Sequence, residues 1–386
     1  MAWKYRAGLV LMVIVLFIWV TSSEITQGIF TSYRHPFAVA YLGTSLLIVH
    51  LPIAFAKDWL LRFLSHRRRK QKPSAESDSQ LKHENVSVTL ENHDLRTPLM
   101  ADNANVVDKL DKNRKLTRME TLVFGFCIAP VWFLTEYLTN AALARTSVAN
   151  TTLLGSTSGL FTLLIGAALG QDSINSIKVI SVVISLVGAS MTTFGSTWFE
   201  DQTAQYNMSL NTKHSLLGDL FAFLSAMTYG LFSVLLQKFS GEQGERVDIQ
   251  KLYGYIGLFT FLGLWWVVWP LSAAGMEPKF EFPHSARIGG IILLDGIVGN
   301  VFSDYLWALV VVWTSPLVAA LGYSLTIPLA MLEDILIHKQ GCSLIYIIGS
   351  AQVFLGFVIA NLSDWISQRL RWEIFNNSFA LPIALT

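Results

Sequence analysis

The sequence is poor in charged residues and in cysteine. Only 14% of its 386 residues are Asp, Glu, Lys or Arg, whereas a soluble globular chain carries about 25%. A soluble enzyme of this composition would lack a polar surface, so we do not expect one. The two cysteines, Cys127 and Cys342, are too few for a disulfide framework or a cysteine zinc site. The histidines show no metal-ligand spacing, so we expect neither a metal nor another cofactor.

Two further signals are missing. There is no basic groove with interleaved aromatic residues, so the sequence does not predict nucleic-acid binding. The segment 155–159, Gly-Ser-Thr-Ser-Gly, resembles a nucleophile elbow, but Thr stands at the nucleophile position and no strand precedes it. We therefore expect no catalytic residue.

The sequence is instead rich in long apolar runs. Hydrophobic residues make up 52% of the chain, and 23 of its 55 charges fall within residues 57–118. A helix needs about 20 mostly apolar residues to cross a bilayer. Ten segments meet this requirement: 7–30, 37–56, 119–143, 146–169, 176–195, 215–237, 252–273, 287–312, 315–337 and 343–363.

The charges between these segments predict the topology. If the N-terminus is cytoplasmic, 22 of the 28 Lys and Arg residues lie on the cytoplasmic side, as the positive-inside rule requires. Residues 57–118 then form a cytoplasmic, largely disordered loop, and 364–386 a cytoplasmic tail. The first run also resembles a signal peptide, but ten spans give an even topology and favour a retained helix. Asn207 falls on the luminal or outer side, where its Asn-Met-Ser sequence can accept a glycan.

An internal repeat relates the two halves. A shift of 168 residues aligns Thr-Glu-Tyr-Leu at 135–138 with Ser-Asp-Tyr-Leu at 303–306, and further along it aligns Gly188 with Gly356. We assign 1–56 and 119–195 to the first repeat and 215–363 to the second. Each repeat has five spans, so the second enters the membrane from the opposite side. Inverted repeats are typical of secondary transporters, with the substrate site near mid-membrane. Gly188 and Gly356 serve either helix packing or a homodimer interface.

The repeat places an acid twice inside the membrane. Glu136 and Asp304 each lie about 17 residues into a span, where an ionised side chain costs at least about 2.5–3.5 kcal/mol. Asn140 and Asn300 lie one helical turn from these acids, on the same faces. This pattern predicts a cation- or proton-linked site. The alternative is a pair of structural hydrogen bonds between helices.

Other residues are weaker candidates for the same site. Glu24 stands in the polar half of the first span, unless that span ends early and leaves it at the membrane interface. The role of Asp295 stays open. Aromatic and hydroxyl side chains expected to line the cavity are Tyr137, Ser156, Tyr229, Tyr305, Tyr323 and Ser324.

Several of these stretches resemble a known family. Residues 303–308, 314–319 and 324–328, together with 150–161, are similar to the drug/metabolite transporter superfamily (EamA-like). More narrowly, they resemble the F subfamily of solute carrier family 35 and its plant and fungal relatives. The resemblance implies an all-α integral membrane fold of ten transmembrane helices in two inverted five-helix repeats. It further implies a central cavity from spans 1–4 and 6–9, peripheral spans 5 and 10, and alternating access.

Two motifs of the related nucleotide-sugar carriers are missing. Those carriers have Phe-Tyr-Asn-Asn in span 7 and Gly-Ala-Leu-Asn-Lys in span 9, where this chain has Tyr-Gly-Tyr-Ile-Gly at 253–257 and Ala-Leu-Gly-Tyr-Ser at 320–324. No Lys or Arg in these two spans is available to hold a diphosphate. Nucleotide-sugar antiport is therefore only an alternative.

These patterns predict a secondary transporter of a small organic solute, neutral or cationic and thiamine-like or nucleobase-like. Its partners would be that solute and the lipid bilayer, with a homodimer left open. We expect an endomembrane, vacuole or Golgi, in preference to the plasma membrane. The rival class is a non-transporting membrane scaffold or receptor that acts through its cytoplasmic loop.

Deleting residues 71–105 separates these two classes. Solute uptake should persist after the deletion, because this segment lies outside every predicted span. Uptake into vesicles that contain equal amounts of the intact and the shortened chain measures the effect. If uptake is absent in both, while proteins that co-purify with the intact chain disappear with the deletion, the scaffold reading is correct.

Overall fold

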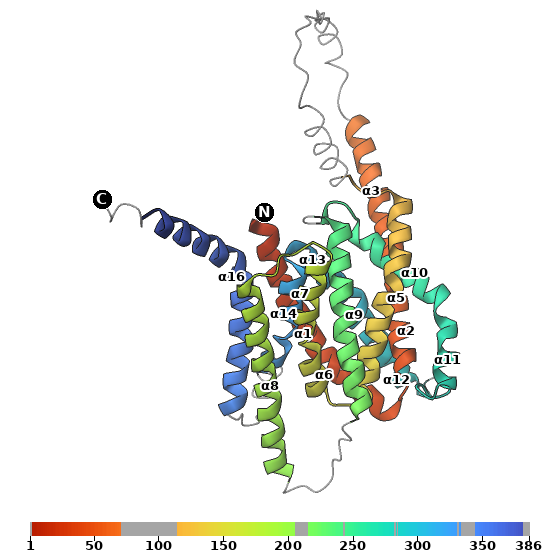
Figure 1. Cartoon of the computed structure of the whole chain (residues 1–386). Helices are drawn as coiled ribbons and strands as arrows, with labels where there is room; N and C mark the ends of the chain where they lie inside the picture. Colours follow the sequence, from red (N-terminus) through yellow and green to blue (C-terminus); the bar gives the residue numbers. More distant parts are fainter. Residues whose placement is uncertain are drawn as a thin grey trace, which may run out of the picture.

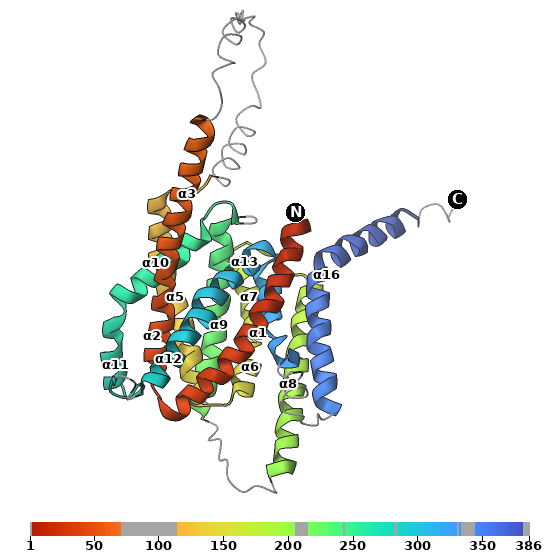
Figure 2. The same cartoon turned by 180° about the vertical axis from the view of Figure 1, so that it is seen from behind.

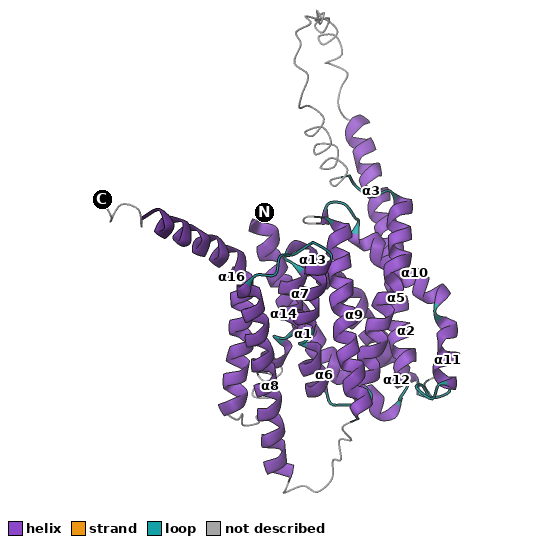
Figure 3. Cartoon of the chain, viewed as in Figure 1, coloured by secondary structure: helices purple, strands orange, loops and turns teal. Residues whose placement is uncertain are grey.

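The computed structural model describes residues 2–70, 114–204, 215–241, 244–281, 283, 285–329, 332 and 344–380. These residues form helices and connecting loops and contain no strand (Figures 1 and 3). The predicted all-α class is therefore confirmed. The elements are α1 (Ala2–Ser32), α2 (Pro36–Leu46), η1 (Leu47–Val49), α3 (His50–Lys70), α5 (Arg118–Leu143), α6 (Val148–Gly155), α7 (Ser158–Ala168), α8 (Ser176–Ala204), α9 (Leu216–Ser240), α10 (Ile249–Gly263), η3 (Trp265–Val267), α11 (Val268–Ala273), α12 (Ala286–Asp295), η4 (Gly296–Phe302), α13 (Ser303–Trp313), α14 (Pro316–Tyr323) and α16 (Leu344–Ala380).

Eight helices of the described chain are long and apolar enough to cross a membrane. The pair formed by α10 and η3–α11 is bent by 49° and counts as a ninth if it is one span. The predicted ninth span, 315–337, corresponds to a shorter apolar helix, Pro316–Leu329, and its remainder lies mostly outside the described residues. The second candidate span runs from Pro36 to Leu64, longer than the predicted 37–56, and its helix continues to Lys70. The predicted glycan acceptor Asn207 and the centre of the 57–118 loop also lie outside the described residues.

Hydroxyl caps set where several helices begin. Thr117 caps α5 in a capping box: its side chain accepts from the backbone N–H of Glu120, whose carboxylate accepts from the backbone N–H of Thr117. Ser147 caps α6, and Ser315 caps α14 with Pro316 at the first helical position. Serine is a favoured N-cap residue, and proline is favoured at the first helical position, so both starts follow from the local sequence.

The hydrophobic core and the polar interior occupy opposite ends of the bundle. The largest buried apolar cluster takes residues from the first half of α1 and α5 and from the second half of α9 and of the α12–η4–α13 helix, among them Met12, Ile128, Phe232, Leu236 and Val311. The second half of α1 and the first half of α9 instead present polar side chains inward. Because α1 and α5 run opposite to α9 and α13, the cluster fills the end at which α1 begins (Figures 1 and 2).

Helices α8 and α16 pack against each other at the edge of the bundle (Figures 1 and 2). A methyl group on Gly188 would lie 2.7 Å from the backbone nitrogen of Val353 and 2.8 Å from the carbonyl oxygen of Gly349. A methyl group on Gly356 would lie 2.5 Å from Ser185 Oγ. Small residues allow this close approach of membrane helices. The mirrored glycines therefore serve helix packing within one chain.

Replacing Gly188 with Ala should lower the free energy of unfolding by about 1–3 kcal/mol, because the new methyl group meets backbone atoms of α16 that have no room to move. Gly290→Ala is the matched control, since nothing lies within 4 Å of a methyl group there. Thermal unfolding in detergent measures both variants. Equal melting temperatures for the two would show that the helix contact is not tight.

Candidate functional site

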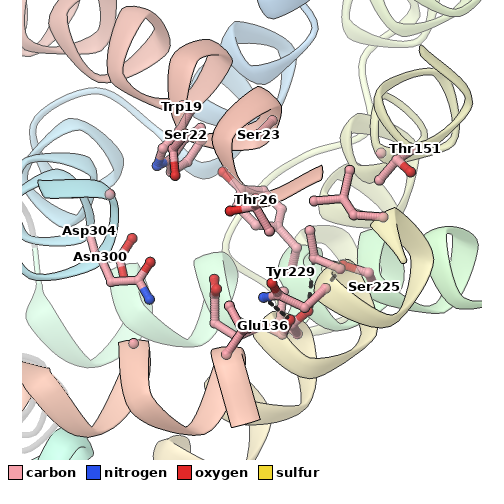
Figure 4. Close-up of a pocket in the computed structure, with 18 of the residues that line it drawn as sticks. Trp19, Ser22, Ser23, Thr26, Glu136, Thr151, Ser225, Tyr229, Asn300 and Asp304 are labelled. Carbon is pink, nitrogen blue, oxygen red and sulfur yellow. Dashed lines mark hydrogen bonds between the residues drawn. The ribbon is translucent and has the colours of Figure 1, made fainter. Parts of the chain in front are cut away.

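A polar pocket lies inside the half of the bundle opposite the apolar cluster. The empty space within its lining, open solvent at the mouth included, is about 1060 Å3. Lining residues come from α1, α2, α5, α6, α7, α9, α12, η4, α13 and α14 (Figure 4). In the described part of the chain, α8, α10, α11 and α16 contribute none. This agrees with the prediction that spans 5 and 10, which are α8 and α16, lie at the periphery. Span 7, which comprises α10 and α11, was predicted to line the cavity and does not.

Three carboxyl groups share this pocket: Glu136 of α5, Asp295 at the end of α12 and Asp304 in the first turn of α13. Glu136 lies close enough to the other two for their negative charges to repel one another. No three acidic, His or Cys side chains of the described residues are placed to hold a metal ion. The described lining contains no Lys, Arg or His, so no fixed positive charge balances these acids.

Hydroxyl contacts between α5 and α9 turn Glu136 toward the pocket. Thr135 Oγ1 donates to Thr228 Oγ1 at 2.9 Å, and Thr139 Oγ1 lies 2.6 Å from Ser225 Oγ. These two threonines flank Glu136 in sequence and fix the face that α5 presents to α9. Asn140 donates its side-chain amide to the backbone oxygen of Glu136 at 2.9 Å.

The other two acids differ in their surroundings. Asp295 accepts from Ser22 Oγ at 2.6 Å and from Thr26 Oγ1 at 3.1 Å, both on α1. Asp304 is buried, and its Oδ2 has no hydrogen-bond partner among the described residues. A buried carboxyl oxygen without a partner costs free energy. Asp304 is therefore the acid with most to gain from a bound proton or cation.

Aromatic rings form the wall next to these acids. Trp19 packs on Trp307 with ring centroids 4.7 Å apart and on Tyr323 at 5.8 Å. Tyr229 lies 6.1 Å from Trp307 and 6.3 Å from Tyr323. Trp19 Nε1 donates to Ser303 Oγ at 3.0 Å, which fixes the indole beside Asp304. Trp19, Tyr229 and Tyr323 line the pocket, and Trp307 supports them from behind.

Glycines of α2 and η4 leave room for polar side chains of neighbouring helices beside the acids. A methyl group on Gly43 of α2 would lie 1.9 Å from Asn300 Nδ2. Only glycine at this position leaves room for the Asn300 amide. A methyl group on Gly299 would lie 2.6 Å from Ser22 Oγ, the donor to Asp295. Both glycines are therefore needed for the polar wall to assemble.

Six of the eleven sequence-predicted site residues line this pocket: Glu136, Asn140, Tyr229, Asn300, Asp304 and Tyr323. Glu24 does not, because it is exposed on the outer side of α1 while Ser23 and Thr26 face the pocket.

Four other predicted residues are displaced for a common reason. Each directly follows a residue that does line the pocket, and consecutive residues on a helix face different directions. Tyr137 points toward Phe37, with ring centroids 6.1 Å apart, and Tyr305 packs on His50 at 5.3 Å. Ser156 and Ser324 are buried away from the pocket.

Sequence reasoning left Asp295 open and did not select its donors Ser22 and Thr26. Nine residues separate Asp295 from Asp304, and at about 100° per residue an α-helix would place them half a turn apart. The π-helical segment η4 lies between them. Its wider turns change this phase and bring both acids to one pocket. Insertions of this kind are frequent at functional sites.

A separate polar cluster lies beyond the end of α5, outside the spans. Glu277 is buried in the loop between α11 and α12, and burial raises its pKa from 4.5 to about 7. The nearby Arg145 guanidinium acts in the opposite direction and lowers this pKa. Arg145 also donates to the backbone oxygen of Met276 and lies 5.1 Å from the ring centroid of Phe221.

This cluster should make stability depend on pH. Glu277 binds its proton more tightly in the folded chain than in the unfolded chain. Its contribution to the free energy of unfolding is therefore full below about pH 4.5 and is lost as the pH rises through 7. As the pH rises over this range, Glu277 should lower the free energy of unfolding by as much as about 3 kcal/mol, and Glu277→Gln should remove this decline. Thermal unfolding between pH 4.5 and 8 measures it, with the exposed Glu281→Gln in the same loop as control. An unchanged slope in the Glu277 variant would contradict the assignment.

Comparison with known proteins extends these observations. Residues 107–194 match the EamA-like transporter family. Over 374 residues the chain is 33% identical to an uncharacterised vacuolar membrane protein of Saccharomyces cerevisiae, covering 94% of this chain and 91% of that protein. It is 30% identical to a thiamine-repressible mitochondrial transport protein of the same yeast, covering 92% of each.

More distant proteins are also similar. Solute carrier family 35 member F5 of Bos taurus is 28% identical, covering 93% of this chain and 77% of that protein. One solved crystal structure superimposes with a TM-score of 0.55 and 15% identity, covering 95% of this chain and 99% of that one. At this identity the structural match supports the fold alone.

Proposed function

The chain belongs to the drug/metabolite transporter superfamily and, within it, to the F subfamily of solute carrier family 35, and from this premise we propose that it carries a small organic cation by alternating access. It is a multi-pass membrane protein and a solute transporter, not an enzyme. The observation that carries the proposed substrate class is the pocket: three acids and an aromatic wall, with no basic side chain in the described lining.

The chemistry of this pocket favours a cation. Aromatic faces attract organic cations, more strongly when water is excluded. Trp19, Tyr229 and Tyr323 supply such faces, and Glu136 and Asp304 supply the counter-charge. Thiamine-like solutes, which combine a fixed charge with flat rings, fit this description. A neutral nucleobase-like solute would use the rings and amides and leave the acids to protons.

A nucleotide sugar fits poorly. Its diphosphate would meet three carboxyl groups and no Lys or Arg among the described lining residues. Like charges brought together at low dielectric repel strongly. We therefore propose against nucleotide-sugar antiport.

We propose ten spans in two inverted five-helix repeats. The two acids related by the 168-residue shift, Glu136 and Asp304, line one pocket from α5 and α13. Equivalent positions of two inverted repeats are expected to meet in this way at the repeat interface. The proposal assigns α14 to the ninth span and α16 to the tenth.

Alternating access is supported by the uneven interior. The pocket lies in the half of the bundle where α1 and α5 end, and the apolar cluster seals the half where they begin. Exposing the pocket to the other side requires this cluster to open. The break between α6 and α7 and the bend after α10 are places where spans can flex.

For the membrane, we propose an endomembrane. The 33%-identical yeast relative is named as a vacuolar membrane protein. The name of the thiamine-repressible relative describes its repression and mitochondrial transport and gives no substrate.

The double variant Glu136→Gln/Asp304→Asn tests this proposal. Uptake of organic cations into proteoliposomes should fall at least tenfold, because a hydrogen bond to a charged group is worth about 1.5–3 kcal/mol. Glu24→Gln is the matched control, because this acid lies on α1 outside the pocket. Uptake by this variant should match that of the wild type.

Ligand-induced thermal shifts identify the solute independently. A ligand at 100 times its dissociation constant adds about 2.7 kcal/mol to the folded state. The panel holds thiamine, organic cations, nucleobases, nucleosides, amino acids and nucleotide sugars. A shift with cations that disappears in the double variant supports the proposal. A shift with nucleotide sugars alone would overturn it.

A further inference from the structure

A second cavity lies on the surface of the bundle between α5 and α9, away from the transport pocket. This groove, which is open to the surroundings, sits at the end where α5 begins. It shares no lining residue with the transport pocket. Its lining is Arg114, Leu116, Met119, Glu120, Val123, Phe124, Cys127, Ile128, Leu235, Phe239 and Arg246.

The body of the groove is apolar and open to the surroundings of the bundle. Met119 is 72% exposed, Val123 57% and Phe239 40%, and Cys127 is also exposed. The rings of Phe239 and Phe124 pack with centroids 4.4 Å apart and form one wall. Exposed apolar residues on a membrane-spanning helix contact acyl chains, so the body suits a hydrocarbon chain that runs along α5.

The mouth of the groove is built from two arginine-bearing segments that hold each other. Leu116 N–H donates to the backbone oxygen of Arg246 at 2.8 Å, and Arg246 Nε donates to the backbone oxygen of Arg114 at 3.4 Å. Gly241 has a φ of +73°, and a methyl group there would lie 2.6 Å from Arg246 Cδ. The Arg246 side chain thus lies over a glycine that leaves room for it.

The charge at the mouth is positive. The described lining contains two arginines, Arg114 and Arg246, and one acid, Glu120, so its net charge is positive. Arg114 pairs with Glu120 at 2.5 Å. Lys115 and Arg118 are exposed beside the mouth and add to it. Basic sites between membrane helices at their polar ends are suited to acidic lipid head groups.

We propose that this groove binds an anionic glycerophospholipid, with its phosphate between Arg114 and Arg246 and one acyl chain along Met119, Val123 and Cys127. The apolar body accounts for the chain and the arginine mouth for the head-group charge. The ligand is a component of the surrounding bilayer, and its binding does not depend on the identity of the transported solute.

Native mass spectrometry of the detergent-solubilised full-length chain tests the proposal. The probes are phosphatidylglycerol, phosphatidylinositol and phosphatidylcholine with identical acyl chains. The wild type should bind the two anionic lipids more tightly than phosphatidylcholine. Arg114→Gln and Arg246→Gln should each reduce this preference about fivefold. Lys57→Gln, which removes a charge at the same end of the bundle but outside the groove, should not.

Two more variants change one component at a time. Glu120→Gln removes the acid from the mouth yet keeps a side chain able to complete the capping box with Thr117, so it should raise the affinity for anionic lipid about fivefold. Cys127→Trp fills the apolar body and should reduce binding of all three lipids without changing their order.

Equal binding of phosphatidylcholine and the anionic lipids by wild type would overturn the proposal. The proposal would also be overturned if Lys57→Gln reduced the preference for anionic lipid as much as the arginine variants do. Non-specific surface charge would then explain the preference. Tryptophan fluorescence and the melting temperature of each variant verify folding. The increase expected from Glu120→Gln cannot result from misfolding, and its absence in a folded variant contradicts the assignment.

Discussion

The cost of holding acidic side chains inside a membrane governs this structure. An ionised carboxylate at the centre of a bilayer costs at least about 2.5–3.5 kcal/mol unless it meets water, a partner or a proton. Glu136, Asp295 and Asp304 line one pocket whose described lining contains no base. Hydroxyls of α1 satisfy Asp295, whereas Asp304 keeps an oxygen without a partner in the described chain. The pocket must therefore admit water, protons or cations, and this requirement links the fold to transport.

Close approach of helices makes this polar pocket compatible with an otherwise apolar bundle. Gly43 and Gly299 bring α2, η4 and α1 close enough for Asn300 and Ser22 to reach their places. At the edge, Gly188 and Gly356 lock α8 to α16. Packing of small residues replaces the hydrophobic effect as the force between helices in lipid.

Two sites of different character follow from one arrangement of α5 and α9. Their inner faces meet through Thr135, Thr139 and Ser225 and orient Glu136 toward the transport pocket. Their outer faces leave the apolar groove with arginines at its mouth. A lipid in that groove would contact the same two helices that position the acid.

The sequence by itself determined the helical class, most of the spans, the caps at Ser147 and Ser315, and the paired acids Glu136 and Asp304, because apolar length, capping chemistry and internal repetition are local or periodic signals. Only the tertiary structure decided which neighbouring side chain faces inward. Tyr137, Tyr305, Ser156 and Ser324 each follow a lining residue and turn away, and Glu24 faces outward. Asp295 joined the site through a π-helical segment, which changes the phase that regular helical periodicity assumes.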